Sequence, residues 1–213
     1  MKKIFFYTFL LIPAALLAQV KIDRSKAPAP GPAPVIKVGQ PATFTLANGL
    51  KVFVVQNTKL PRVSVTLTLD HDPVLEGNKA GMTAMAGSLM GRGTTTMKKA
   101  QLDEAIDFLG ASISTDASSA SVSSLTTNFS KAMALLSDVV LHPAFPASEL
   151  EKIRKQTLSG LQTQKDDPNA ITQKVISNLM YGKDHPYGDV ETEETVKKIT
   201  VDDIKKYSSI HSY

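Results

Sequence analysis

The stretch Val63-Ser-Val-Thr-Leu-Thr-Leu69 alternates apolar and hydroxyl side chains over its whole length. Successive side chains of a β-strand point to opposite faces, so the pattern predicts a strand with one buried face and one wet face. After a loop over residues 70–78, residues 80–90 are small and apolar almost throughout, which predicts a buried helix. A half-buried strand followed by a buried helix indicates a sheet that packs against helices.

A hairpin is predicted upstream of this strand. Residues 43–46 alternate, Asn48-Gly49 is a strong turn signal, and residues 50–55 are rich in β-branched side chains. Asn-Gly supplies the positive φ angles that a tight hairpin turn needs. We therefore expect two antiparallel strands on either side of this turn.

Downstream of the buried helix, helical and strand patterns alternate. Residues 98–109 have the period of an amphipathic helix. Residues 111–115 and 118–129 have the pattern of paired strands, with Asp116 in the turn between them, and the second strand is rich in Ser and Thr. Residues 131–141 return to a helical period.

The C-terminal part is predicted to be helical. Residues 146–165 form a long helical pattern that Asp166-Asp-Pro168 breaks, and residues 169–179 form another. Thr192 and Thr200 each precede acidic residues and are predicted to cap two short helices. The order of elements predicts an α+β fold, in which a mainly antiparallel sheet is covered on one side by helices.

The N-terminus has the pattern of a secretory signal peptide. Lys2 and Lys3 precede an almost wholly apolar run over residues 4–17, and Ala18 follows as a small residue. The run is shorter than the roughly 20 residues that span a bilayer, so a cleaved signal over residues 1–18 is favoured over an uncleaved anchor. We therefore expect an exported protein, periplasmic, bound to the cell envelope or secreted, with no membrane span after cleavage.

Residues 19–39 are predicted to be a linker, because prolines recur at positions 28, 30, 32 and 34. Proline lacks the amide donor and fixes φ, so the run favours an extended spacer rather than a helix or a central strand. A spacer is also favoured over a ligand for a proline-binding groove. Residues 40–213 then form the folded domain.

Composition excludes several classes of function. The chain has 213 residues and is 42% hydrophobic, which suits one globular domain with a substantial core. Without Lys2 and Lys3, the 24 basic residues become 22 against 20 acidic ones, a balance too weak to indicate nucleic-acid binding. The absence of cysteine excludes disulfides, a cysteine nucleophile and thiolate metal ligands.

Six local patterns along residues 40–213 resemble the N-terminal domain of the insulinase/pitrilysin metallopeptidase family, whose members include the mitochondrial processing peptidases. No one pattern is specific alone, but all occur in the expected order and spacing. They are Phe44-Thr-Leu-Ala-Asn-Gly-Leu-Lys-Val-Phe53, Glu76-Gly-Asn-Lys-Ala-Gly81, Gly93-Thr94, Leu141-His-Pro-Ala-Phe145, Asp166-Asp-Pro168 and His185-Pro-Tyr-Gly188. The family normally continues into a further domain where this chain ends, so the resemblance implies a domain truncated before a following one.

The resemblance implies a zinc site that this chain lacks. Relatives carry His-x-x-Glu-His on a helix, with two histidine ligands and a glutamate base, and a second glutamate ligand some 70 to 80 residues downstream. The flanking glycines assign the motif to residues 84–88, where Ala84 and Ser88 replace the histidines and Gly87 replaces the base. Counting back from Asp166 assigns the last ligand to Ser159 or Gly160. We therefore predict no metal or cofactor for this chain, although active relatives use zinc.

No other residues form a convincing substitute site. His71, between Asp70 and Asp72, is predicted to lie in a solvated turn, and His142 and His185 precede prolines as turn residues. His211 lies in the tail. No two of these histidines have the spacing of ligands on one helix.

Two acidic residues on the long helix, Glu149 and Glu151, are predicted to face solvent with Lys152 and Lys155. The chain also lacks a Gly-x-Ser-x-Gly elbow, a phosphate loop and a dinucleotide fingerprint.

Three functions remain open. The first, implied by the resemblance, is a non-catalytic domain that binds unfolded peptide, by strand addition at an exposed sheet edge, and pairs with an active zinc peptidase subunit or downstream domain. The second is part of a longer zinc metalloendopeptidase whose intact motif lies beyond residue 213. The third is a scaffold or binding protein of the cell envelope that uses only the fold.

Overall fold

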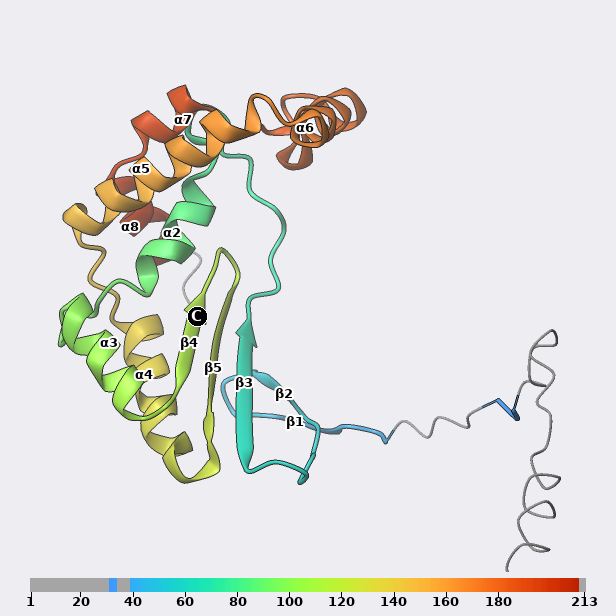
Figure 1. The fold of residues 1–213 in the computed structure, drawn as a ribbon, viewed down its shortest axis with the longest axis vertical. Coiled ribbons are helices and arrows are strands. Elements are labelled where there is room, and N and C mark those ends of the chain that lie inside the picture. Colours follow the sequence, from blue (N-terminus) through green and yellow to red (C-terminus); the bar gives the residue numbers. More distant parts are fainter. Residues whose placement is uncertain (1–30, 34–38, 211–213) are drawn as a thin grey trace, which may run out of the picture. The chain divides into compact units, whose positions relative to one another are not determined.

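The computed structural model describes residues 31–33 and 39–210 (Figure 1). The predicted signal peptide, nearly all of the predicted linker and His211 lie outside these residues. The chain divides into two compact units, residues 1–56 and 57–213.

The described part of the first unit is the predicted hairpin. Strands β1 (Ala42–Thr45) and β2 (Lys51–Val54) are antiparallel, with Phe44 opposite Val52. In the turn, Gly49 has a φ of 88°. A glycine tolerates this left-handed conformation because it has no Cβ, which explains the predicted Asn-Gly turn.

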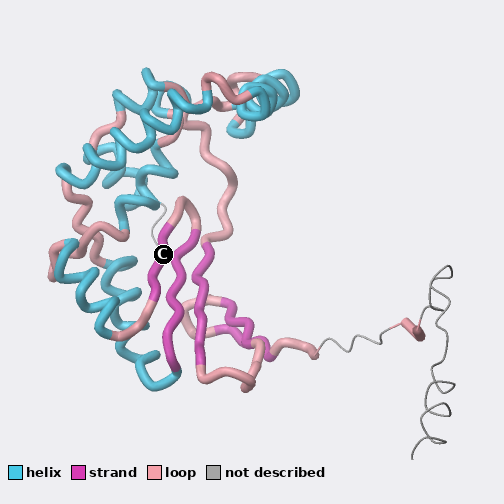
Figure 2. Tube along the Cα trace, in the orientation of Figure 1, coloured by secondary structure: helices cyan, strands magenta, loops and turns pink. Residues whose placement is uncertain are grey.

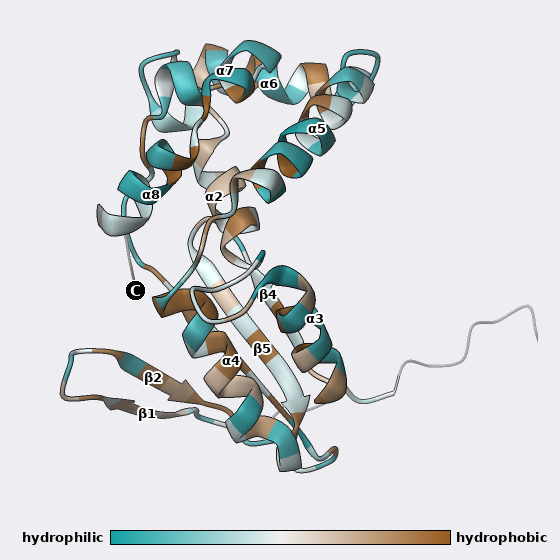
Figure 3. Cartoon of the chain, turned by 90° about the vertical axis from the view of Figure 1, so that its left-hand side faces the viewer, coloured by the Kyte–Doolittle hydropathy of each residue, from teal (hydrophilic) through white to brown (hydrophobic). Residues whose placement is uncertain are grey.

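The second unit contains a three-stranded antiparallel sheet in the order β3-β5-β4. Its strands are β3 (Arg62–Thr68), β4 (Ser112–Thr115) and β5 (Ser119–Leu125). The inner face is apolar, because Val122 and Ala120 of β5 are buried with residues of a covering helix, and the half-buried Val65 and Leu67 of β3 pack against them. Figure 3 shows pale and brown bands alternating along β5, as expected for a strand with two different faces.

The outer face of this sheet is lined by hydroxyl groups. Ser64 lies opposite Ser123 and their Oγ atoms are 2.8 Å apart, and Ser114 and Ser121 pair at the same distance. The prediction that the Val63–Leu69 stretch has one buried face and one wet face is therefore confirmed.

Helices make up the rest of the second unit (Figure 2). They are α2 (Met82–Met90), α3 (Lys99–Phe108), α4 (Phe129–Leu141), α5 (Ala147–Gln164), α6 (Pro168–Tyr181), α7 (Glu193–Lys198) and α8 (Val201–Ile210), with short 3-10 turns η1 (Gly77–Lys79), η2 (Thr126–Asn128) and η3 (Pro186–Gly188). Helices α3 and α4 cover one face of the sheet (Figure 1). The fold class is therefore α+β with helices on one side of the sheet, as predicted, although the strands are divided over two small sheets.

The largest difference from the predicted boundaries is at the end of β5. Strand β5 ends at Leu125 and α4 begins at Phe129, whereas the pattern predicted a strand to residue 129. The chain turns earlier because Thr126 N donates to Pro61 O at 2.9 Å and the Asn128 side chain donates to Leu109 O at 2.9 Å. These two bonds fix a turn that hydrophobic periodicity does not encode.

Two apolar clusters hold the second unit together. One lies between the sheet and α4; the other joins α2, α5, α7 and α8 through side chains such as Leu89, Ile153 and Ile204. Met90, at the end of α2, packs against both clusters. Helix α2 therefore connects the helical layer to the sheet, which makes it central to the candidate site.

Candidate functional site

Helix α2 begins at a carboxylate that the sequence analysis did not single out. The Glu76 carboxylate accepts hydrogen bonds from the backbone N–H groups of Gly81, Met82 and Thr83, at 2.5, 2.8 and 2.9 Å. The first N–H groups of a helix have no partner within the helix, and a negative charge there also interacts favourably with the helix dipole. Glu76 therefore fixes the start of the helix that carries residues 84–88.

The loop that holds Glu76 is itself fixed by a distant segment. Asp189 Oδ2 accepts hydrogen bonds from Glu76 N at 2.9 Å and from Gly77 N at 2.8 Å. The structure thus joins the family-like pattern that starts at Glu76 to the residue that directly follows the pattern ending at Gly188. Glu76, six residues before the first residue of α2, was a usable sequence signal for the contact with the helix start, but nothing in the sequence pointed to Asp189.

Gly87 lies against the turn between β4 and β5. A Cβ placed on Gly87 would come within 2.1 Å of the Asp116 carbonyl carbon and 2.5 Å of Ala117 N. Thr115 Oγ1 also donates to Gly87 O at 2.7 Å. The helix and the turn therefore meet backbone to backbone, and only a glycine fits at this position without a shift.

The other predicted site positions lie on open surfaces. Ala84 and Ser88 of α2 are exposed, and so are Ser159 and Gly160 of α5. A Cβ on Gly160 would have nothing within 4 Å. Helices α2 and α5 pack on each other through their apolar sides, so these small residues belong to two neighbouring helices.

The residues at these positions do not fit a zinc ion. Zinc sites are built from cysteine, histidine, aspartate or glutamate, and alanine and glycine offer no side-chain donor at all. Within residues 31–33 and 39–210, no three such side chains come together as a metal site.

The described histidines have structural partners. His185 Nδ1 accepts from Tyr187 N at 3.1 Å and begins η3, His142 Nδ1 lies 3.2 Å from Asp138 Oδ1, and His71 Nδ1 lies 2.8 Å from the Asp72 carbonyl. His185 and His142 thus serve turns and helix ends.

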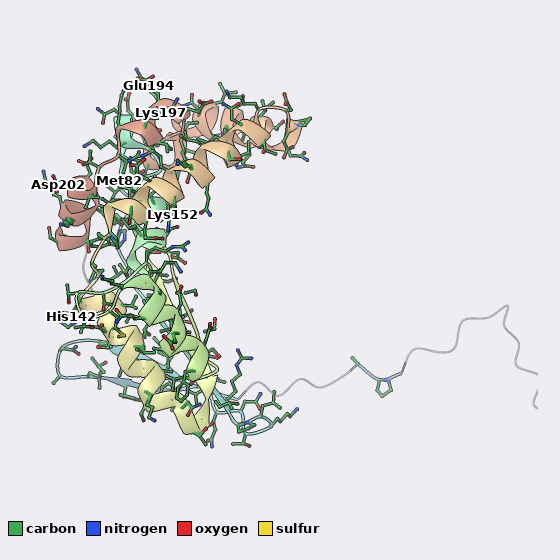
Figure 4. The ribbon with its side chains drawn as sticks, turned by 60° about the vertical axis from the view of Figure 1, so that its left-hand side comes forward. Met82, His142, Lys152, Glu194, Lys197 and Asp202 are labelled. Atoms are coloured by element: carbon green, nitrogen blue, oxygen red, sulfur yellow. The ribbon has the colours of Figure 1, made fainter. Side chains whose placement is uncertain are left out.

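The prediction for Glu149 was wrong. This residue is only 8% exposed, and its Oε1 lies 2.6 Å from Lys152 Nζ. It occupies the first turn of α5, where a carboxylate interacts favourably with the helix N-terminus, and Lys152 follows one turn later (Figure 4). Glu151 forms an ion pair with Arg154.

A hollow of about 420 Å³ lies beside the start of α2. It is lined by the loop after β3, the β4–β5 turn at Ala117 and Ser118, and three acidic residues, Glu76, Asp189 and Glu191. Burial raises the pKa of Glu191 above its ordinary value of 4.5; the nearby charge of Glu76 adds to the shift and Lys174 opposes it. The hollow thus has an acidic side that the sequence analysis did not predict.

Comparison with known proteins agrees with this architecture. The profile described as insulinase (peptidase family M16) matches residues 51–189. A protein of Bacillus subtilis named uncharacterized zinc protease YmxG is 22% identical over 178 residues, which is 80% of this chain and 42% of that protein. The chain thus spans about two-fifths of the length of this relative.

Solved structures share the fold at low sequence identity. A peptidase M16 inactive domain from Pseudomonas fluorescens superposes with a TM-score of 0.70 at 24% identity, over 79% of this chain and 42% of that one. A protease from Helicobacter pylori gives 0.68 at 21%, over 81% and 43%. The periplasmic protease PqqL from Escherichia coli gives 0.66 at 14%, over 92% and 24%.

The family profile spans well over half of the chain, and the same region carries the sheet, α2 and the helices around them. The chain belongs to the insulinase family, peptidase family M16.

Proposed function

We propose that this chain is a non-catalytic M16 domain of the cell envelope, exported by cleavage after Ala18, which binds unfolded peptide and pairs with an active zinc peptidase subunit or domain. The observation that carries the proposal is the close packing of Gly87. Its contact with the Asp116 and Ala117 backbone leaves no space for the glutamate that would act as general base. Ala84 and Ser88, on the same helix, offer no ligand pair.

Peptide binding is proposed at the free edge of β4. The three-stranded sheet has two edge strands, β3 and β4, and β4 is the one tied to α2 through Thr115. An extended peptide can add to such an edge by main-chain hydrogen bonds, which recognise any sequence. The 420 Å³ hollow, which is lined in part by Ala117 and Ser118 of the turn that follows β4, has room for a side chain. Its carboxylates favour a basic one.

A second candidate is part of a longer zinc metalloendopeptidase with its intact site beyond residue 213. The difference in length supports this candidate, because this chain covers only 42% of the relative named as a zinc protease. An envelope scaffold that uses only the fold is the third candidate. An intact His-x-x-Glu-His in the gene beyond codon 213 would favour the second, and a pull-down without any peptidase would favour the third.

The absence of catalysis is tested by measuring zinc content and peptide cleavage on the purified full chain. We expect substoichiometric zinc and no cleavage that a chelator abolishes. The triple variant Ala84→His, Gly87→Glu, Ser88→His provides a sharper comparison, since we expect it to unfold more easily rather than to gain activity. Stoichiometric zinc together with chelator-sensitive cleavage by the unaltered chain would overturn the proposal.

Peptide binding is tested with a fluorescein-labelled peptide of about a dozen residues that contains one lysine. The matched control is the same peptide with N-methyl groups on alternate amides, which lacks the donors for strand addition but keeps every side chain. We expect anisotropy to rise for the first peptide only. Equal binding of both peptides would show that the β4 edge is not the site.

A further inference from the structure

The hollow beside the start of α2 contains a carboxylate to which no described residue donates a hydrogen bond. This residue is Glu191, in the loop between η3 and α7, which lines the hollow together with Glu76 and Asp189. Both oxygens of Glu76 accept N–H groups at the start of α2, and Asp189 Oδ2 accepts two N–H groups of the η1 segment. Glu76 and Asp189 thus have structural partners, whereas Glu191 is open to a ligand.

The Glu191 carboxylate lies directly against the backbone at the start of α2. A Cβ placed on Gly81 would come within 2.4 Å of Glu191 Oε1, and Gly81 has a φ of 99°. A glycine suits this position because the left-handed φ and the neighbouring side chain both disfavour a Cβ. Gly81 also lines the hollow, so the carboxylate lies at the wall of the hollow.

The electrostatic surroundings of Glu191 favour a bound cation. Burial raises the pKa of Glu191, the charge of Glu76 raises it further, and Lys174 of α6 opposes the shift. An opposite charge beside a carboxylate favours its ionised form. A cation in the hollow would therefore offset both the burial of Glu191 and its repulsion by Glu76.

The other walls suit a long alkyl chain. Pro73, Val74, Pro186 and Tyr207 line the hollow, whose volume of about 420 Å³ lies in the range of ligand pockets. Lysine and arginine lay their methylene stems along apolar surfaces and keep the charged end at a polar group. A metal ion fits less well, because nowhere in the described residues do three potential ligand side chains come together.

We infer that Glu191 selects peptides that carry lysine or arginine, by holding the cationic end of that side chain in the hollow. The inference rests on the proposed peptide binding and gives it a sequence preference, which main-chain hydrogen bonds at β4 do not supply. Ala117 and Ser118 belong to the turn that follows β4 and also line the hollow. One turn therefore connects the proposed edge to the proposed side-chain pocket.

The fluorescein-labelled peptide with one lysine tests this preference when it is compared with the same peptide carrying norleucine. Norleucine keeps the alkyl stem and removes the charge. At about pH 8 we expect the lysine peptide to bind the full chain at least about tenfold more tightly, because a charge-assisted hydrogen bond adds to the same stem contacts. An arginine peptide should also bind more tightly than the norleucine peptide. Equal affinities for lysine and norleucine would overturn the inference.

The matched variants are Glu191→Gln and Glu194→Gln. The first removes the charge but keeps the shape of the side chain, and should reduce the lysine preference to about onefold without changing the affinity for the norleucine peptide. The second removes the exposed carboxylate of Glu194 on α7, which pairs with Lys198, and should keep the preference (Figure 4). A preference that survives Glu191→Gln, or that both variants lose equally, would contradict the role of Glu191.

A small probe separates the hollow from the β4 edge. Nα-acetyl-lysine methylamide carries the side chain but no strand, and its titration should shift the amide NMR signals of Gly81, Ser118 and Glu191, whereas the norleucine derivative should not. These shifts, without binding of any peptide, would refute strand addition and support the cation site. Peptide binding with neither lysine preference nor these shifts would overturn the inference and leave strand addition intact.

Discussion

At the scale of single residues, two glycines of the candidate site are expected to respond in opposite ways to the same substitution. Gly87→Ala forces a Cβ into the Asp116 and Ala117 backbone, and should destabilise the fold by about 1–3 kcal/mol, because the turn must shift. Gly160→Ala, also within a helix but in open space, should stabilise it by about 0.5–1 kcal/mol through helix propensity. Urea unfolding of both variants measures the difference.

The pair is its own control, since both changes add one methyl group to a helical glycine. If Gly87→Ala also stabilised the protein, α2 would not be packed against the turn. The structural reason for excluding a glutamate at position 87 would then be lost.

Glu191 is expected to make stability depend on pH. Burial raises the pKa of Glu191 in the folded protein above the value of 4.5 expected in the unfolded chain. The folded state therefore favours the protonated carboxyl group. The stability that this group contributes is fully present below the unfolded pKa and is lost as pH rises through the folded pKa. Glu191→Gln should therefore raise the unfolding temperature at about pH 8 and leave it nearly unchanged at about pH 4.

The matched control is Glu194→Gln. The hydrogen bond from Lys198 lowers the pKa of the exposed Glu194, so its ionised form is the one that is stabilised, above the unfolded value. This variant should not gain stability at about pH 8. A gain of equal size in both variants would show that general charge reduction, rather than burial of Glu191, is the cause.

At the scale of secondary-structure elements, the start of α2 depends on one side chain outside the helix. Glu76→Ala removes the acceptor of three backbone N–H groups and should lower the free energy of unfolding by about 2 kcal/mol. Faster amide hydrogen exchange in the first turn of α2 would localise the effect. Glu104→Ala, on an exposed part of α3, should be nearly neutral, and an equal loss there would contradict a specific capping role.

The elements that the sequence predicted well are those with a local physical signal. The alternation after Val63, the Asn48-Gly49 turn and the Pro168 start of α6 each specify backbone geometry within a few residues. Thr192 and Thr200 are confirmed as caps, because their hydroxyls accept from Thr195 N and Asp203 N. Periodicity and capping need no knowledge of the tertiary structure.

Features that depend on distant contacts were missed. Asp189 contacts Glu76 across more than a hundred residues. For the site, the sequence assigned the motif to positions that include 84, 87 and 88. It left open whether the small residues there let the helix pack closely on its neighbour or leave a cleft. In the structure, Gly87 packs directly against the backbone of a neighbouring turn, whereas the space beside Gly160 is empty.

At the scale of the whole molecule, the described part of the chain contains no helix long and apolar enough to cross a bilayer. We expect the exported protein to begin at Gln19, because two lysines, an apolar run of signal-peptide length and Ala18 precede it.

Intact-mass measurement of the protein from the envelope fraction of an expressing host tests this directly. Leu11→Arg, which interrupts the apolar run, should leave the chain uncleaved and in the cytoplasm, whereas Gln19→Arg lies beyond the run and should still be exported. A chain in the envelope fraction that still begins at Met1 would instead mean that the run is retained as an anchor. The folded domain would then lie at the membrane surface, on a spacer with prolines at positions 28, 30, 32 and 34.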